Sequence, residues 1–298
     1  MHRALDSARG SDVYIKASGV GVFDELLEAA VLDMRGADSL AIFWDVDAPA
    51  TLDRIARNPA DRFAPLIPHY DLIFTYGGGG PVVSAYKAAG ARKCVPIYNA
   101  LDPATHFPVP PDARFSGDLG FVGNRLPDRE ARVEEFFLRA ASLLRDRSFV
   151  LAGNGWKGKP MPLNVNYVGH LYTADHNAFN CSTRAVLNIS RESMARYGFS
   201  PATRVFEAAG AGACLITDAW KGIEMFLEPG QEVLVCHNAE EVAATIEGLT
   251  ADRARRIGLA AQRRILSRHT YAHRAGQVHT ILSGAIPETH FAAAEGLP

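Results

Sequence analysis

Short apolar runs alternate with longer stretches in which apolar residues recur at helical spacing. In the first part of the chain, the runs predict strands at residues 13–16, 40–44, 71–76 and 93–97, and the longer patterns predict helices at 22–34 and 82–89. This β-α-β rhythm is typical of a parallel sheet covered by helices. The expected fold class is therefore α/β.

A break follows, in which Pro103, Pro108, Pro110 and Pro111 crowd a stretch without periodicity, as in an interdomain linker. The rhythm then restarts, with strands predicted at 118–122, 148–152, 165–168, 185–189, 213–217 and 232–236 and helices at 129–144, 203–209, 239–249, 252–267 and 271–283. We therefore predict an N-terminal domain at 1–110, a C-terminal domain at 111–285 and a tail at 286–298. The first domain has about four strands, fewer than a full doubly wound domain, so it is short or truncated.

The composition and the charge argue against several classes of protein. The 31 basic and 33 acidic residues nearly cancel, giving a net charge of -2, which argues against binding nucleic acid mainly by charge. No apolar window is long enough to span a membrane, and the N-terminus lacks the apolar core of a signal peptide. The four cysteines fit no zinc pattern, and three of them stand in apolar stretches, where they are interpreted as core residues. A reducing compartment is therefore expected. A cytoplasmic protein is expected.

The segment at residues 197–218 carries the most informative candidate chemistry. Ser200 is suited to cap a helix, so a helix N-terminus with free N–H groups is expected there. Such an N-terminus attracts a diphosphate, and Arg204 in the first turn can pair with a phosphate oxygen. Glu207, one turn beyond Thr203, offers a carboxylate that can accept hydrogen bonds from vicinal ribose hydroxyls. Spacing alone fits an ordinary capped helix equally well.

Two glycine-rich turns follow predicted strands, and the carboxyl ends of parallel strands line the ligand crevice of open α/β sheets. Glycine lets the backbone approach a ligand closely, Arg125 can contact a phosphate, and Trp156 can shield or stack on a base. Tight turns with a structural tryptophan are the alternative. The candidate donor-site residues in these turns are Gly123, Asn124, Arg125, Gly153, Asn154, Gly155 and Trp156.

Taken as a set, these features resemble group 1 glycosyltransferases. The resemblance rests on Asn-Ile-Ser-Arg at 188–191, Ser-Pro-Ala-Thr-Arg-Val-Phe-Glu at 200–207 and Thr-Tyr-Ala-His-Arg at 270–274, and it extends over about residues 118–282, towards the branch of the spore maturation protein CgeB. It implies a GT-B-like fold with two Rossmann-like domains facing a cleft. It also implies transfer of a sugar from a UDP-, GDP- or ADP-type donor to an unknown acceptor. Arg191 joins the donor site, and no metal or cofactor is expected.

One position departs from the family pattern. The first of two paired glutamates should stand at position 199, which is Phe199, and only the second is matched, by Glu207. In the family the first carboxylate lies near the reaction centre, so the resemblance supports the nucleotide end of the site better than the catalytic end. An inactive binding protein and an epimerase-like enzyme of this fold are therefore alternatives. A nicotinamide dehydrogenase is disfavoured, because Asp24 stands where the dinucleotide fingerprint needs a third glycine.

Candidate catalytic residues come from the first domain. Asp45 and Asp47 form an Asp-x-Asp at the end of a predicted strand, and one of them is predicted to act as a base toward an acceptor hydroxyl or simply to bind it. Two carboxylates alone are too few ligands for a typical metal site, and a surface or capping role is an alternative. The four glycines at 77–80 predict a flexible loop, and His106 has no metal-ligand spacing, so it is taken as a structural histidine.

Overall fold

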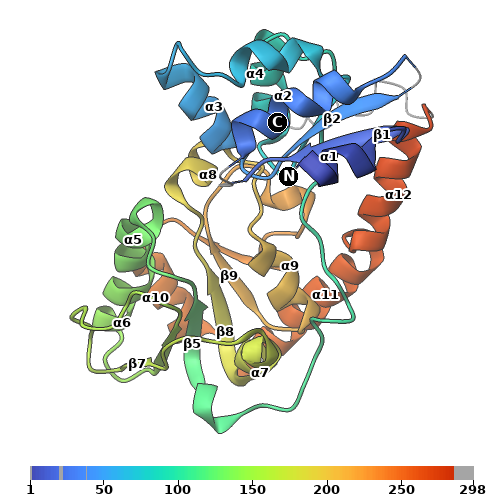
Figure 1. Cartoon of the computed structure of the whole chain (residues 1–298). Helices are drawn as coiled ribbons and strands as arrows, with labels where there is room; N and C mark the ends of the chain where they lie inside the picture. The colour runs from blue at the N-terminus through green and yellow to red at the C-terminus, as the bar shows by residue number, and fades with distance from the viewer. Residues whose placement is uncertain (1, 20–22, 38, 285–298) are drawn as a thin grey trace. The chain divides into compact units, whose positions relative to one another are not determined.

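The structure is a computed structural model that describes residues 2–19, 23–37 and 39–284 (Figure 1). The predicted tail at 286–298 and the predicted helix start at residue 22 lie outside the described residues. The chain divides into two compact units. Unit 1 comprises the chain up to Tyr98, residues Tyr197–Ser200 and the chain from Gln277, and unit 2 comprises Asn99–Arg196 and Pro201–Gly276.

Unit 1 is built on a parallel sheet in the order β1-β2-β3-β4. Its strands are β1 (Val13–Ala17), β2 (Leu40–Asp45), β3 (Leu72–Thr75) and β4 (Cys94–Pro96), and its helices are α1 (His2–Ala8), α2 (Asp24–Met34), α3 (Ala48–Arg57) and α4 (Gly79–Ala88), with a 3-10 turn η1 (Ala64–His69). Phe43 and Ile73 face a core shared with α2, α3 and α4, whereas Ile42 and Phe74 face Ile281 of α12 (Tyr271–Leu282). The strand order runs in one direction without reversal.

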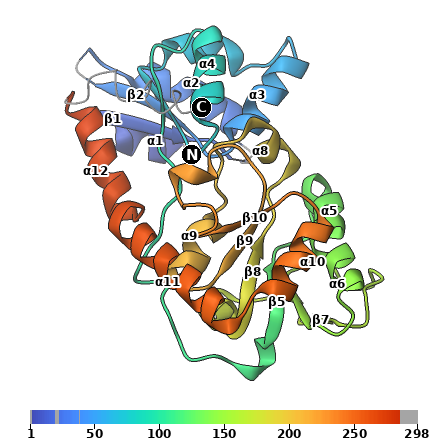
Figure 2. The same ribbon diagram turned by 180° about the vertical axis from the view of Figure 1, so that it is seen from behind.

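Unit 2 contains a larger parallel sheet in the order β10-β9-β8-β5-β6-β7, of which Figure 2 shows β10, β9, β8 and β5 side by side. The strands are β5 (Gly117–Val122), β6 (Phe149–Ala152), β7 (Val165–Tyr167), β8 (Thr183–Asn188), β9 (Leu215–Asp218) and β10 (Leu234–Cys236). The order reverses between β5 and β8, because β6 and β7 continue to one side of β5 and β9 and β10 to the other.

Helices cover both faces of the unit 2 sheet, which explains why β6 and β9 are fully buried, whereas the edge strand β7 is partly exposed. Phe149 and Leu151 face one core, whereas Val150 and Ala152 face another, as the two-residue period of a strand requires. The first core is covered by α5 (Pro127–Val133), the π-helical segment η3 (Glu134–Arg139), α6 (Ala140–Leu143) and α10 (Ala239–Gly248). The other helices of the unit are α7 (His176–Ser182), α8 (Glu192–Tyr197), α9 (Thr203–Gly210) and α11 (Ala251–Arg268), with 3-10 turns η2 (Ala113–Phe115), η4 (Thr173–Asp175) and η5 (Ile223–Met225).

All ten predicted strands are present within about two residues of their expected ends. The predicted flexible loop at 77–80 is wrong in its second half, because Gly79 and Gly80 form the first turn of α4. All four cysteines are free thiols. Within the part of the chain described, no helix has the length and apolar character that crossing a membrane requires.

Candidate functional site

The reversal of strand order in unit 2 marks the place where a ligand is expected. In open α/β sheets, ligands bind outside the carboxyl ends of the strands at such a switch point. In unit 2 this point lies between β5 and β8, whose carboxyl ends lead into Gly123 and Ile189. The candidate site is therefore assembled from the turns that follow these two strands and from the helices after them.

The two predicted glycine turns lie against each other at the ends of β5 and β6. The Asn154 N–H donates to Oδ1 of Asn124 at 2.9 Å, and the Arg125 N–H donates to the Asn154 carbonyl at 2.8 Å. The Gly123 N–H donates to the Ala152 carbonyl at 2.9 Å. The structure thus brings all of the candidate turn residues into one small region of unit 2.

Two of these glycines are required by close contacts. Gly153 has a φ of +127°, and a Cβ there would lie 2.3 Å from the carbonyl oxygen of Gly123. A Cβ on Gly123 would lie 2.8 Å from Nη2 of Arg129 and 2.9 Å from the ring of Phe121. The absence of a side chain at 123 therefore leaves the space that the Arg129 guanidinium occupies.

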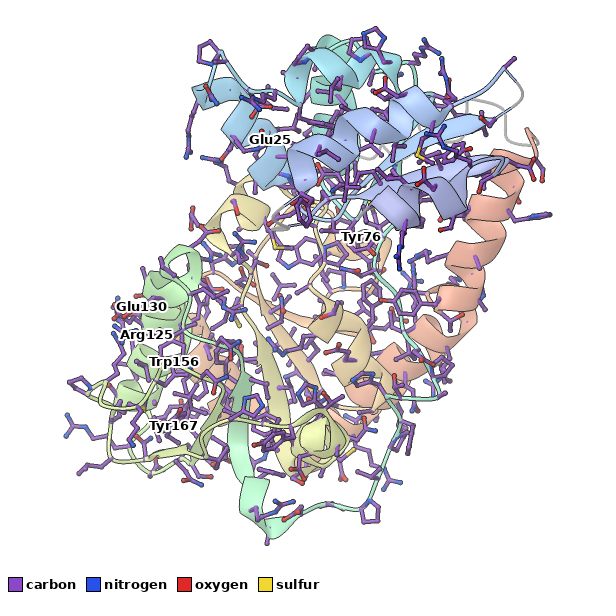
Figure 3. All side chains as sticks on the ribbon, viewed as in Figure 1. Glu25, Tyr76, Arg125, Glu130, Trp156 and Tyr167 are labelled. Carbon is purple, nitrogen blue, oxygen red and sulfur yellow. The ribbon has the colours of Figure 1, made fainter. Side chains whose placement is uncertain are left out.

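Trp156 does not have the position predicted for a base-stacking residue. Its side chain is fully buried, and its Nε1–H donates to the Gly123 carbonyl at 2.7 Å. Tyr167 donates its hydroxyl to the Gly153 carbonyl in the same way, at 2.8 Å (Figure 3). The stacking prediction is wrong, because a fully buried ring has no face left for a base. Trp156 instead fixes the turn after β5.

Arg125 points away from this buried ring and pairs with an acid on the next helix. Its Nη2 lies 2.7 Å from Oε1 of Glu130, and Figure 3 shows the two side chains together at α5. The hydrogen bond to Glu130 raises the pKa of Arg125. The guanidinium is already partly neutralised, so a phosphate there would compete with Glu130. Contact of Arg125 with phosphate remains a prediction.

Two other arginines share the buried ring of Phe121 on β5. The guanidinium carbon of Arg129, on α5, lies 5.7 Å from the ring centroid, and that of Arg204, on α9, lies 5.5 Å from it. Among the described residues neither forms an ion pair with a carboxylate, and Nε of Arg129 is buried without a hydrogen-bond partner. We call Arg129, Arg204 and Phe121 the arginine pair site.

Electrostatics in the arginine pair site are unfavourable for the protein alone. Burial lowers the pKa of Arg129, and the neighbouring charge of Arg191 lowers it further. Burial also lowers the pKa of Arg204 to about 10, against the attraction of Glu207 and with repulsion from Arg129. Partly buried positive charges without a paired anion are costly, and an anionic ligand would offset that cost.

Arg191 stands at the carboxyl end of β8 and is held by α5. Its Nε lies 3.1 Å from Oδ2 of Asp128, which also accepts the Ser193 hydroxyl at 2.8 Å. The structure therefore brings Arg191 to the switch point near Arg129, as an arginine whose charge is shared with Asp128.

A buried polar network lies beneath this region, at the ends of β8 and β9. Asp218 accepts from the Ser190 N–H at 3.0 Å and from Nη2 of Arg132 at 2.6 Å. Burial raises the pKa of Asp218, and the Arg132 charge opposes that rise. The network ties α5 to the carboxyl ends of two strands and so fixes the direction in which Arg129, one turn before Arg132, projects.

The predicted cap at Ser200 is wrong. Helix α9 begins at Thr203 with Ala202 as its N-cap, and the Ser200 hydroxyl donates to the Gly198 carbonyl at 2.9 Å. Ser200 belongs to unit 1, where the neighbouring Phe199 has a left-handed φ of 48° and accepts from the Gly78 N–H at 2.8 Å. Thr203 is exposed at the start of α9.

The two candidate catalytic aspartates differ in burial. Asp45 is fully buried; its Oδ1 accepts from Ser18, Thr51 and the Asp47 N–H, and its Oδ2 accepts from Tyr86. Burial raises its pKa, and these hydrogen bonds oppose the rise. The prediction that Asp45 acts as a base is wrong, because every donor around it is internal and no face is exposed. Asp47 is half-buried at the N-cap of α3, and its role remains a prediction.

Glu207 lies half-buried in α9, one turn after Arg204, and its hydrogen bonds to a ribose remain a prediction. The residues that sequence reasoning missed are Arg129, Arg132 and Asp218. The available signal was the spacing of Arg129 and Arg132, three residues apart at the start of the helix that follows a glycine turn. Such a pair projects from one face of the first turns.

The fold and this site define a class of protein, the α/β proteins with a ligand site at the switch point of the sheet. Comparisons with known proteins identify the family within this class. A family model described as glycosyl transferase-like matches residues 129–280, more than half of the chain. The chain belongs to this glycosyl transferase-like family. A search of the curated proteins finds no match.

Solved structures show the same fold. Sucrose-phosphate synthase from Thermosynechococcus elongatus superposes with a TM-score of 0.67 at 14% identity, over 96% of this chain and 77% of its own. HepE from Anabaena, solved with UDP-glucose, has a TM-score of 0.69 at 14% identity, over 95% of this chain and 81% of its own. The lipopolysaccharide outer core galactosyltransferase WaaB has a TM-score of 0.61 at 13% identity, over 96% and 79%. The chain is a glycosyltransferase of the GT-B fold.

Proposed function

We propose that the protein transfers a sugar from a nucleoside-diphosphate sugar to an acceptor hydroxyl, and that the arginine pair site of unit 2 binds the diphosphate. The observation that carries this proposal is the pair of guanidiniums that share the Phe121 ring without an acidic partner among the described residues. Arginine forks match phosphate oxygens in geometry and charge. The glycine at 123 leaves the space in which the Arg129 guanidinium lies beside the Phe121 ring.

The nucleoside end is assigned to Glu207 and the turns around it. A carboxylate can accept hydrogen bonds from both hydroxyls of a ribose, and Glu207 lies one turn along α9 from Arg204. That separation suits a nucleotide whose diphosphate lies at Arg204. The complex of HepE with UDP-glucose supports a uridine donor, although the same site chemistry fits GDP- and ADP-sugars.

In the reaction, the bond between the anomeric carbon and the diphosphate oxygen breaks, and a new bond forms from that carbon to the acceptor oxygen. The acceptor proton leaves, and the departing nucleoside diphosphate takes up the electron pair. Arg129 and Arg204 stabilise the charge that develops on this leaving group, so no metal ion is needed for that task. Phe199 supplies no carboxylate where the family has its first glutamate, so we assign no base.

Calorimetry with UDP-glucose, GDP-mannose and ADP-glucose tests the proposal. We expect one of them to bind, and Arg129→Ala or Arg204→Ala to weaken it about 10- to 100-fold, since a hydrogen bond to a charged group contributes roughly 1.5–3 kcal/mol. Arg129→Lys should recover only part of the affinity, because it keeps the charge and loses the fork.

Arg139→Ala is the matched control. Arg139 lies in the same helical run as Arg129 but pairs with Glu135 at 3.2 Å and with Glu240. Its loss should leave nucleotide affinity unchanged. If no nucleotide sugar binds the wild-type protein, or if both alanine variants bind as tightly as wild type, the diphosphate assignment is wrong.

A further inference from the structure

Three metal-ligating side chains from distant parts of unit 2 meet at one place. His106 lies in the segment after Asn99, His176 is the first residue of α7, and Glu207 lies in α9. Their ligand atoms all lie within 4.8 Å of one another, and each side chain is half-buried. No motif spacing joins these residues, so the cluster exists only in the folded unit.

The hydrogen bonds around His106 fix which ring nitrogen faces the cluster. The Thr105 hydroxyl donates to the Asp102 carbonyl at 3.1 Å and lies 2.9 Å from Nδ1 of His106. Since its single proton is engaged, the Thr105 oxygen accepts from the Nδ1–H. Nε2 of the neutral ring therefore carries its lone pair toward the cluster, 4.0 Å from Oε1 of Glu207. This nitrogen and the carboxylate oxygen can both coordinate a cation that lies between them.

His176 completes the set as a second imidazole. Its ring centroid lies 6.3 Å from that of His106, and the ring hydrogen-bonds the backbone of Leu171. Burial lowers the pKa of His176, which favours the neutral ring that a metal ion binds. A backbone hydrogen bond at one ring nitrogen, with the other free for a metal, is the common arrangement of metal-binding histidines.

We propose that His106, His176 and Glu207 form a binding site for a divalent transition-metal ion of the Zn²⁺ type. Two imidazoles and a carboxylate are a ligand set that Zn²⁺ accepts. A tetrahedral ion with bonds of about 2.0–2.1 Å needs its ligand atoms about 3.3 Å apart, which modest side-chain rotations can achieve from the present separations. Three protein ligands leave a fourth position open for water or another ligand.

The surroundings limit the affinity of this site. Arg204 lies close enough to both Glu207 and His176 to affect them electrostatically, and its charge opposes a bound cation. Binding should therefore be weaker than at a closed four-ligand zinc site. Glu207 is also the carboxylate that the proposed function assigns to the ribose, so nucleotide and metal compete for it. The site itself does not rest on the proposed function.

The test uses untagged, chelator-treated, reduced protein without nucleotide at about pH 8. Zn²⁺ is titrated by calorimetry, and Co²⁺ by its visible absorption, which reports coordination geometry. We expect one ion per chain and a tetrahedral Co²⁺ spectrum. His106→Gln, His176→Gln and Glu207→Gln should each weaken binding at least about 10-fold, and Thr105→Val should weaken it through the ring orientation of His106.

His237→Gln is the matched control, because His237 and Glu241 form an exposed pair at 2.9 Å that could capture Zn²⁺ instead. Its loss should not change the affinity. The proposal is overturned if wild-type protein binds no ion, if the His106, His176 and Glu207 variants bind as tightly as wild type, or if His237→Gln abolishes binding. Arg129→Ala should weaken nucleotide binding and leave metal affinity unchanged, so failures of the two proposals are distinguishable.

Discussion

Gly153 occupies a backbone conformation that side-chain-bearing residues adopt only with strain. Its φ is +127°, and an added Cβ would lie 2.3 Å from a backbone oxygen that cannot move independently. We expect Gly153→Ala to lower the free energy of unfolding by about 3 kcal/mol, from backbone strain and the displaced turn together. Urea denaturation measures the loss.

Gly158 provides the comparison for this effect. It also has a left-handed φ, +81°, but a Cβ there would meet nothing within 4 Å. Gly158→Ala should therefore cost only the conformational strain, about 1 kcal/mol. Equal losses for the two variants would mean that the contact between the glycine turns does not matter for stability.

The buried His269 makes the free energy of unfolding of unit 2 depend on pH. Burial lowers its pKa from 6.5 to about 3, and the charges of Arg274 and Arg264 add to the effect. In the unfolded chain the ring takes up a proton below about pH 6.5. The folded protein does so only near pH 3, so its stability falls as the pH falls through that window.

We expect His269→Gln to flatten this dependence. The slope of unfolding free energy between about pH 4 and pH 6 should decrease by up to about 1.4 kcal/mol per pH unit. The contacts that the ring makes with Phe206 and Phe226 are lost at every pH, so they shift the curve without changing its slope. If unfolding free energy changes with pH by the same amount in the variant and the wild type, the lowered pKa of His269 is contradicted.

At the scale of elements, α10 and α11 are each held at their start by a side-chain cap. Asn238 accepts from the Glu241 N–H at 2.9 Å, and Thr250 accepts from the Arg253 N–H at 3.2 Å. Asn238→Ala and Thr250→Ala should each lower the free energy of unfolding by about 1 kcal/mol, because a free helix N–H loses its partner. Ser267→Ala, exposed near the end of α11, should stay within about 0.5 kcal/mol of wild type by thermal unfolding. A cap variant as stable as Ser267→Ala would show that the cap does not stabilise its helix.

Most strands were predictable because they are buried on both faces and therefore appear in the sequence as apolar runs. The short helix α7 was not predictable, because it contains one large buried apolar residue, Phe179. A single such residue does not make a helical period over seven positions. The presence of α7 is determined by the sheet that it covers.

Within the site, the turns were predictable and the arginine pair was not. Glycines after strands are visible in a sequence, whereas Arg129 and Arg204 meet only because β5 places Phe121 between their helices. The expected cap at Ser200 failed for a tertiary reason as well. Its hydroxyl is engaged by Gly198, and a Cβ on Gly77 would lie 2.8 Å from its Oγ, so residues 197–200 pack against the turn before α4.

At the scale of the whole molecule, each unit has its own core and its own tryptophans, whose fluorescence can report unfolding. Trp44 lies in unit 1, whereas Trp156 and Trp220 lie in unit 2. The sequence contains three tryptophans, so Trp44→Phe leaves a chain whose tryptophan fluorescence reports unit 2 alone. This substitution is mild, because the indole N–H of Trp44 is buried without a hydrogen-bond partner.

A nucleotide that binds the arginine pair site should raise the unfolding temperature of the Trp44→Phe protein as seen by fluorescence. A ligand at 100 times its Kd stabilises the native state by about 2.7 kcal/mol, which shifts the midpoint of a unit of this size by roughly 5–10 °C. The shift should fall to about half or less when Arg129→Ala is added, and it should keep its full size when Arg139→Ala is added. A shift that the loss of Arg129 does not reduce would place the nucleotide outside the arginine pair site. So would a shift that is seen only by Trp44 in a Trp156→Phe, Trp220→Phe protein.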